Sequence, residues 1–129
     1  MIAKNNIFNI RKGAKWLGVT GERKGFAEFD NTEHAVRAWL LLMRTYRRRY
    51  GCRTIRQIVT RYAPPSENDT RGYIGHCCRY LLMDQDDELL LDMEYCQLGV
   101  AMARMETGTA MENRELYRVK KKYDISIVE

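Results

Sequence analysis

The chain has 129 residues, a formal net charge of +5 and 45% hydrophobic residues. That length fits one compact domain that buries a sizeable core without a disulfide or a metal ion. The composition excludes a disordered chain, and no apolar run approaches the roughly 20 residues that cross a bilayer. The first ten residues lack the apolar core and cleavage site of a signal peptide, so we expect synthesis in a cytoplasm.

Residues 1–30 show no helical period and are punctuated by glycines, so we expect irregular structure with short extended pieces. From Asp30, with Glu33 as its capping-box partner, the pattern predicts a long helix that ends at Gly51. Thr54 predicts the start of a short helix, and Pro64 with the next proline stops it.

Ser66 predicts the start of a further helix, with Asp69 in capping-box spacing. After an acidic turn at residues 84–88, another helix begins near Leu89 or Asp92 and ends at Gly108. Residues 109–129 are expected to form a basic extension, with a helix at 112–123 and a tail strand at 125–128. The prediction is therefore a mainly α single domain, with a helical core at 31–108.

Charged residues are distributed unevenly along the chain. Residues 41–62 hold arginines and no acid, whereas residues 83–103 hold acids and no base. One interpretation is two solvated faces that complement each other in the fold. The other is an arginine-rich surface, within residues 44–61, that binds nucleic acid or an anionic cell-wall polymer. The four cysteines form no C-x-x-C pair, so we expect reduced thiols, no metal and no cofactor.

One carboxylate lies on an apolar helix face. Glu106 follows Met102 by four positions and Leu98 by eight, so it shares their side of the helix. Desolvation there would raise the pKa of Glu106, as a general acid near neutral pH requires. The structural alternative is that Glu106 reaches solvent or pairs with Arg104 or Arg114.

Several segments resemble enzymes that cleave bacterial cell walls. The stretch AMARMETG at residues 101–108 resembles the helix end A-x-x-R-x-E-[ST]-G of lytic transglycosylases and glucosaminidases, whose glutamate is the catalytic acid. Residues 5–11 resemble the N-N-x-F-x-I-[KR] segment that follows this helix in the glucosaminidases. Residues 25–28 resemble the G-x-x-Q segment that lines the cleft, and residues 67–74 the late E-T-x-x-Y-V segment. Because the glutamate comes first in those enzymes and last here, the resemblance implies a circularly permuted lysozyme-like (α+β) fold.

Nearly all of residues 5–108 also resembles a family of small phage and prophage proteins, usually labelled virion structural proteins. The most specific match is the APPSENDT stretch at residues 63–70. Two positions depart from that pattern. Tyr62 replaces a tryptophan, and Glu28 replaces a glutamine, which puts a carboxylate where an amide would donate a hydrogen bond.

The resemblance implies a phage-associated enzyme that cleaves the glycan strand of peptidoglycan, like a lytic transglycosylase or a muramidase. Glu106 would be the catalytic acid and Glu28 a possible second acid. The implied substrate-binding residues are Asn6, Asn9, Phe26, Phe29, Asn68 and Tyr73. Each has a structural alternative, since the phenylalanines could anchor the core and the asparagines could satisfy turn backbone.

Two other functions compete with this one. A non-catalytic virion structural protein could retain a lysozyme-like fold and bind other virion proteins. An arginine-rich helical domain could bind nucleic acid, although no base-reading motif is present. In either phage case the protein would be virion-associated or released at lysis.

Overall fold

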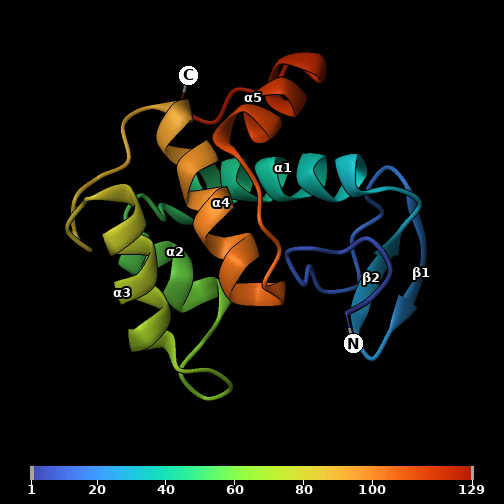
Figure 1. Cartoon of the computed structure of the whole chain (residues 1–129), viewed down its shortest axis with the longest axis horizontal. Coiled ribbons are helices and arrows are strands. Elements are labelled where there is room, and N and C mark those ends of the chain that lie inside the picture. Colours follow the sequence, from blue (N-terminus) through green and yellow to red (C-terminus); the bar gives the residue numbers. More distant parts are fainter. Residues whose placement is uncertain (1, 129) are drawn as a thin grey trace.

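The computed structural model describes residues 2–128 and contains five helices and a two-stranded sheet, arranged as Figure 1 shows. In chain order the elements are β1 (Val19–Arg23), β2 (Phe26–Phe29), α1 (Thr32–Tyr50), α2 (Ile55–Tyr62), α3 (Thr70–Leu81), α4 (Asp92–Thr107) and α5 (Asn113–Lys122). The predicted mainly α fold, with a small β component at the front, is confirmed.

Glycine and threonine signals placed several helix ends correctly. Gly51 and Gly108 end α1 and α4 in the left-handed conformation, with φ of 66° and 72°. Thr54 caps α2 and forms a reciprocal capping box with Gln57.

Three local predictions are corrected. The N-cap of α1 is Asn31, whose side chain accepts from the His34 backbone N–H, while Asp30 contacts the His34 ring. The N-cap of α3 is Asp69 rather than Ser66, because residues 64–67 form a turn closed by the Pro64 carbonyl. Residues 125–128 are irregular and form no strand.

The irregular front contains a β-hairpin and a segment that runs beside it. β1 and β2 pair antiparallel, with Arg23 opposite Phe26. Residues 4–12 then lie along the other edge of β2, where backbone hydrogen bonds join Phe29 to Lys4 and Ala27 to Ile10. Side chains alternate along β2, so Ala27 and Phe29 enter the core while Phe26 and Glu28 are half-buried on the opposite face.

Helix α4 crosses the centre of the molecule, between α3 and α5 and against α1 (Figure 1). Its glycine, Gly99, allows close packing, because a Cβ there would overlap Leu116 of α5 and lie 3.0 Å from the Trp39 ring of α1. The helical period also places Met105 with Leu98 and Met102 on the apolar face, but 40% of Met105 is exposed, so the buried face ends before it.

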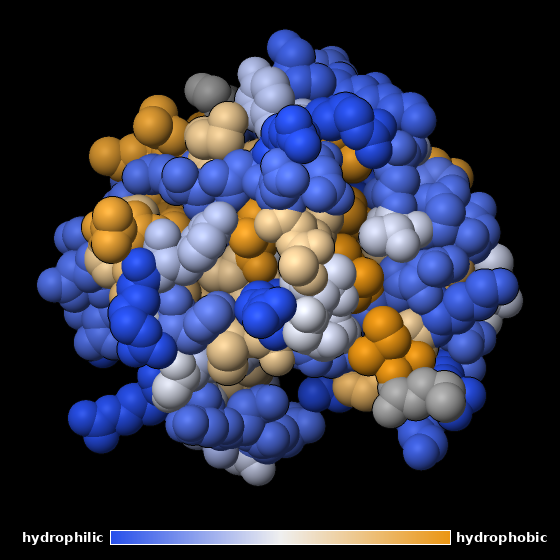
Figure 2. Space-filling view, viewed as in Figure 1, coloured by the Kyte–Doolittle hydropathy of each residue, from blue (hydrophilic) through white to orange (hydrophobic). Residues whose placement is uncertain are grey.

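The arginine-rich and acidic segments meet in part. Arg56 donates to Asp86 at 2.7 Å, and buried Arg47 donates to the Leu89 carbonyl and lies 3.9 Å from Glu88. Hydrophobic atoms reach the surface over the loop between α3 and α4, where Leu82, Leu90 and Leu91 are exposed (Figure 2). Within residues 2–128, no helix combines the length and the apolar character needed to cross a membrane.

Candidate functional site

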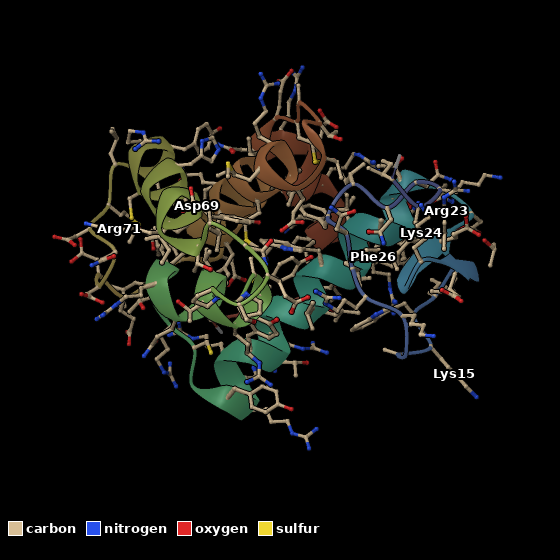
Figure 3. The ribbon with its side chains drawn as sticks, turned by 90° about the horizontal axis from the view of Figure 1, so that it is seen from below. Lys15, Arg23, Lys24, Phe26, Asp69 and Arg71 are labelled. Atoms are coloured by element: carbon tan, nitrogen blue, oxygen red, sulfur yellow. The ribbon has the colours of Figure 1, made fainter. Side chains whose placement is uncertain are left out.

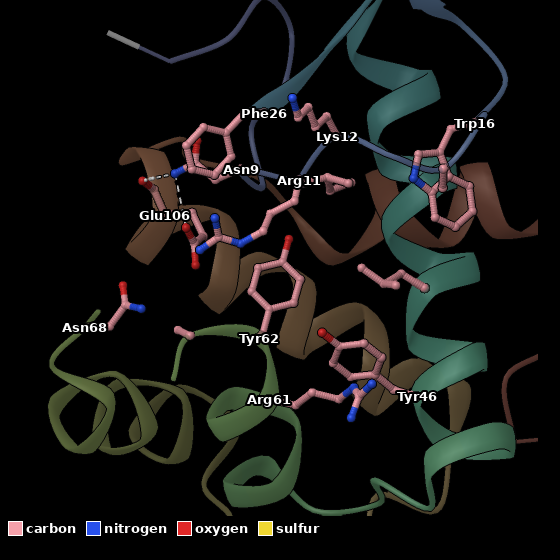
Figure 4. Close-up of a pocket in the computed structure, with 14 residues that line it drawn as sticks. Asn9, Arg11, Lys12, Trp16, Phe26, Tyr46, Arg61, Tyr62, Asn68 and Glu106 are labelled. Atoms are coloured by element: carbon pink, nitrogen blue, oxygen red, sulfur yellow. Dashed lines mark hydrogen bonds between the residues drawn. The ribbon is translucent and has the colours of Figure 1, made fainter. Parts of the chain in front are cut away.

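A hollow of about 380 Å³ lies between the N-terminal segment, the end of α4 and helices α1 and α2. We call it the groove. Its lining residues are Asn9, Ile10, Arg11, Lys12, Ala14, Trp16, Phe26, Leu42, Tyr46, Arg61, Tyr62, Ala63, Asn68 and Glu106. That volume lies within the range usual for small-ligand sites in proteins. Figure 4 shows the aromatic rings, the basic side chains and Glu106 around this space.

Glu106 lines the groove from the last turn of α4 and is half-buried. Its Oε1 accepts a hydrogen bond from the Asn9 amide at 3.1 Å, and its Oε2 accepts one from the Tyr73 hydroxyl at 2.9 Å. Neither Arg104 nor Arg114 pairs with it: Arg104 reaches the Gly108 carbonyl and Arg114 pairs with Glu112.

Burial raises the pKa of Glu106 above its ordinary value. The hydrogen bonds from Asn9 and Tyr73, and the charge of Arg11, act in the opposite direction but do not outweigh the desolvation. A carboxyl group in these surroundings retains a proton to higher pH than an exposed one, and it can therefore serve as a proton donor.

The loop that carries Asn9 is fixed by a fully buried amide. Asn6 donates to the carbonyl oxygens of Ile10 and Ala27, at 2.9 and 2.8 Å, and accepts from the Ile10 N–H at 2.9 Å. Asn9 itself has φ of 52°, in the left-handed region that asparagine tolerates better than most residues. The loop is thus closed on itself and attached to β2, with the Asn9 amide directed at Glu106.

Two further side chains hold this loop from the helical half. Thr107, which follows Glu106 in the sequence, donates to the Ile7 carbonyl at 2.8 Å. Tyr62, at the end of α2, donates to the Phe8 carbonyl at 2.6 Å. The backbone around Asn9 is therefore held by α2, α4 and β2, which is the kind of support that a precise site requires.

The remaining predicted residues fall into separate groups. Phe26 and Asn68 line the groove, and Figure 3 shows Phe26 on the hairpin side, opposite the start of α3 at Asp69. Phe29 has no exposed surface and packs in the core, and Asn6 is also fully buried, so both belong to the support of the site rather than to its walls. Glu28 is half-buried on β2 and is not among the residues that line the groove.

The sequence prediction missed the far half of the groove. Trp16 and Tyr46 form part of its wall, and Tyr62 lies between Tyr46 and Glu106 (Figure 4). Arg11 forms an ion pair at 3.1 Å with Glu67 and lies over the Phe26 ring at 5.4 Å. Trp16 and Tyr46 belong to motifs, W-x-G and Y-x-x-x-x-G, that the chain shares with the resembled phage family, but those motifs implied no site role, and their place in the groove follows from the fold.

The chain is related to a phage protein. Protein P5 of Pseudoalteromonas phage PM2 is 33% identical over 117 residues, which cover 84% of this chain and 71% of that protein. The chain belongs to the family of Protein P5. No protein-family profile matches the chain. The relationship to Protein P5 agrees with the phage family that the sequence resembles.

Among residues 2–128, no group of three or more histidine, cysteine or acidic side chains is placed to hold a metal ion. Cys77 and Cys96 are buried, whereas Cys52 and Cys78 are half-buried, and all four are free thiols. Burial raises the pKa of Cys77 to about 12, so this thiol stays protonated at neutral pH. Glu106 is the acidic residue among those that line the groove of this Protein P5 relative.

Proposed function

We propose that this member of the Protein P5 family is a virion-associated phage protein that cleaves the glycan strand of bacterial peptidoglycan. The observation that carries the proposal is the Glu106 carboxyl group in the groove, with one oxygen bonded to Asn9 and the other to Tyr73. Glu106 would donate its proton to the oxygen between two sugars as the glycosidic bond breaks.

The step that follows cleavage of the glycosidic bond distinguishes a lytic transglycosylase from a hydrolase. A retaining hydrolase needs a second carboxylate close to the first, about 5 Å away. Glu28 is the candidate for that role, but Glu106 is the acid among the residues that line the groove. We therefore favour transglycosylase-like chemistry, in which the Glu106 carboxylate accepts a proton from the muramyl 6-hydroxyl as that oxygen closes an anhydro ring.

In this proposal Phe26 and Asn68 contact the sugar, because both lie on the groove wall. Asn9 and Tyr73 act as positioning residues that orient the Glu106 carboxyl group. Asn6 acts one step further away, since it shapes the loop that presents Asn9.

The contact between the N-terminal segment and the end of α4 supports the proposed circular permutation. In the enzymes that the sequence resembles, the catalytic helix leads into the N-N-x-F-x-I segment. Here the end of α4 lies beside that segment, because Thr107 donates to Ile7 and Glu106 bonds to Asn9. A chain in which this helix led directly into the N-N-x-F-x-I segment would therefore connect two parts that already lie side by side here.

The second candidate is a virion structural protein that retains this fold without activity and binds other virion proteins. The relationship to Protein P5 of phage PM2 supports it, because a structural role needs only that the chain is a phage protein. The fully hydrogen-bonded Glu106 would then hold the N-terminal segment to α4. Nucleic-acid binding by residues 44–61 has less support, because Arg47 and Arg56 are engaged with other parts of the chain.

One comparison separates the two candidates. Purified peptidoglycan sacculi are incubated with wild-type protein, with Glu106→Gln and with Glu115→Gln, which removes an exposed carboxylate on α5. The proposal expects soluble fragments from wild type and Glu115→Gln and at least about a hundredfold less from Glu106→Gln, the usual size of a general-acid contribution. Mass spectrometry then identifies anhydro or reducing ends. Equal release by all three proteins contradicts the role of Glu106, whereas no release by wild type contradicts the enzyme and leaves the structural role.

A further inference from the structure

Basic side chains outnumber acidic ones among the residues that line the groove. Arg11, Lys12 and Arg61 line it, and Glu106 is the acid in that lining. Arg11 is paired with Glu67 at the rim. Among residues 2–128, Lys12 and Arg61 form no ion pair. Lys12 lies beside Phe26, on the opposite side of the groove from Arg61 (Figure 4), so Arg61 is the unpaired cation at its own end of the groove.

The Arg61 guanidinium is held in place by aromatic rings. Its central carbon lies 3.6 Å from the centre of the Tyr50 ring and 5.4 Å from that of Tyr46. Stacking of this kind immobilises the planar group and leaves its N–H edges available for a carboxylate. Arg61 therefore loses less side-chain entropy on binding an anion than a free arginine would.

Arg61 and Glu106 lie at opposite ends of the groove, with Tyr62 between them (Figure 4). A ligand that reaches both must extend beyond the bond that Glu106 would cleave. In a peptidoglycan strand the muramyl residues carry a lactyl group, and with it a stem peptide or a free carboxylate, whereas chitin carries neither.

We propose that the Arg61 end of the groove binds a carboxylate of the substituent on the muramyl sugar. This inference rests on the proposed function and names its substrate class: glycans that carry carboxylates, as opposed to neutral polymers of N-acetylglucosamine. The carboxylate anchors the strand at a distance from the scissile bond and sets which sugar lies at Glu106.

The test measures binding with cleavage switched off. Glu106→Gln protein is sedimented with two insoluble glycans, intact sacculi and chitin, and the soluble glycan strands that an amidase frees from sacculi by removing the stem peptides are added as a competitor. Amidase treatment leaves the lactyl carboxylate, so it separates the two sources of charge. Binding to sacculi but not to chitin, with competition by the amidase-freed strands, assigns the lactyl carboxylate. The same binding without competition by those strands assigns the stem peptide.

Arg61→Gln is then added to this background, with Arg53→Gln as a matched control that removes an exposed arginine from the same region but outside the groove. A charge-assisted contact predicts a loss of roughly tenfold in affinity for sacculi with Arg61→Gln and little change with Arg53→Gln. Arg61→Lys, which keeps the positive charge, provides a second variant if Arg61→Gln lowers the melting temperature. Partial retention by Arg61→Lys would follow from its charge.

Equal binding of sacculi and chitin, or equal losses for Arg61→Gln and Arg53→Gln, overturns the inference. These outcomes are separate from the test of cleavage. If sacculi bind with the expected pattern but wild type releases no fragments, the carboxylate site stands and the enzyme does not. If wild type releases fragments but the protein binds chitin as well as sacculi, the enzyme stands and the carboxylate site does not.

Discussion

The Tyr73 hydroxyl and the Glu106 carboxylate, 33 positions apart in the sequence, meet at 2.9 Å inside the molecule. This hydrogen bond favours the ionised form of Glu106 and lowers its pKa, against the larger effect of burial. Burial and the nearby Glu106 raise the pKa of the Tyr73 hydroxyl, so Tyr73 stays protonated and remains a hydrogen-bond donor to Glu106.

Tyr73→Phe is therefore expected to raise the pKa of Glu106 further. If protonated Glu106 is the acid, activity falls as pH rises through its pKa, so the alkaline limb of the pH profile moves to higher pH. Release of fragments from sacculi as a function of pH measures this shift. Tyr80→Phe, an exposed tyrosine on the same helix, is the control and should leave the profile unchanged. A shift to lower pH would contradict the assigned role.

Asn6→Ala is expected to destabilise the protein by about 2–3 kcal/mol, because it removes three hydrogen bonds and leaves the buried Ile10 N–H without its acceptor. It should also reduce activity, although Asn6 is fully buried and does not line the groove. Urea unfolding measures the first effect. Asn68→Ala removes an exposed amide with one 3.3 Å contact and should change stability little. Equal stability of the two variants would show that Asn6 does not hold the loop.

Glu33 ties the start of α1 to α5, since it accepts from Arg118, Lys122 and Tyr123. Lys122, followed by Tyr123, lowers the pKa of Glu33 from 4.5 to about 2. A lowered carboxylate pKa stabilises the folded state above the unfolded pKa, and that contribution disappears as pH falls from 4.5 to about 2.

We therefore expect Glu33→Gln to cost about 1 kcal/mol at pH 7, the upper end for solvent-accessible ion pairs. Unfolding curves of wild type and variant should converge as pH falls toward 2. Glu22→Gln on β1 is a control, because its carboxylate contacts only the nearby Gly25 N–H. A difference that persists unchanged at the lowest pH would exclude the ion pairs as its cause.

Gly99→Ala should destabilise the protein by about 1–3 kcal/mol, because the added methyl group overpacks the contact of α4 with Leu116 and Trp39. Helix propensity alone predicts the opposite sign, since alanine gains about 1 kcal/mol over glycine. Gly75→Ala is the matched control, as its Cβ would meet only the flexible end of Arg79, at 3.2 Å. Thermal unfolding compares the two variants, and a more stable Gly99→Ala would show that this packing is not tight.

Local signals were sufficient for most helix ends. Gly51, Thr54 and Gly108 each act through backbone within a few residues, so the sequence alone reveals them. The start of α3 was less clear because Ser66 and Asp69 both resemble caps, and only the turn at Pro64 decides between them. The tail at 125–128 has strand-like composition, but Asp92 accepts the backbone N–H groups of Ile127 and Val128 instead of a neighbouring strand.

The candidate site could be predicted only in part, because its partners are distant in the sequence. Helical periodicity placed Glu106 on a buried face, and the resemblance identified Asn9 and Tyr73 nearby. Periodicity contains no information about which loop lies against that face, so it could not separate Asn9, which contacts Glu106, from Asn6, which supports the loop. Arg61 belonged to a charge run, and its place in the groove follows only from the packing of α2 against α1.

The contact between Asn9 and Glu106 also has a consequence for synthesis. These residues are separated by 97 positions, so the ribosome releases the N-terminal loop long before its partner exists. Non-local contacts of this kind form late in folding, after the entropy of closing a long loop has been lost. The groove is therefore expected to take shape only when almost the whole of α4 has emerged, and a nascent chain would carry the loop with its key acid still missing.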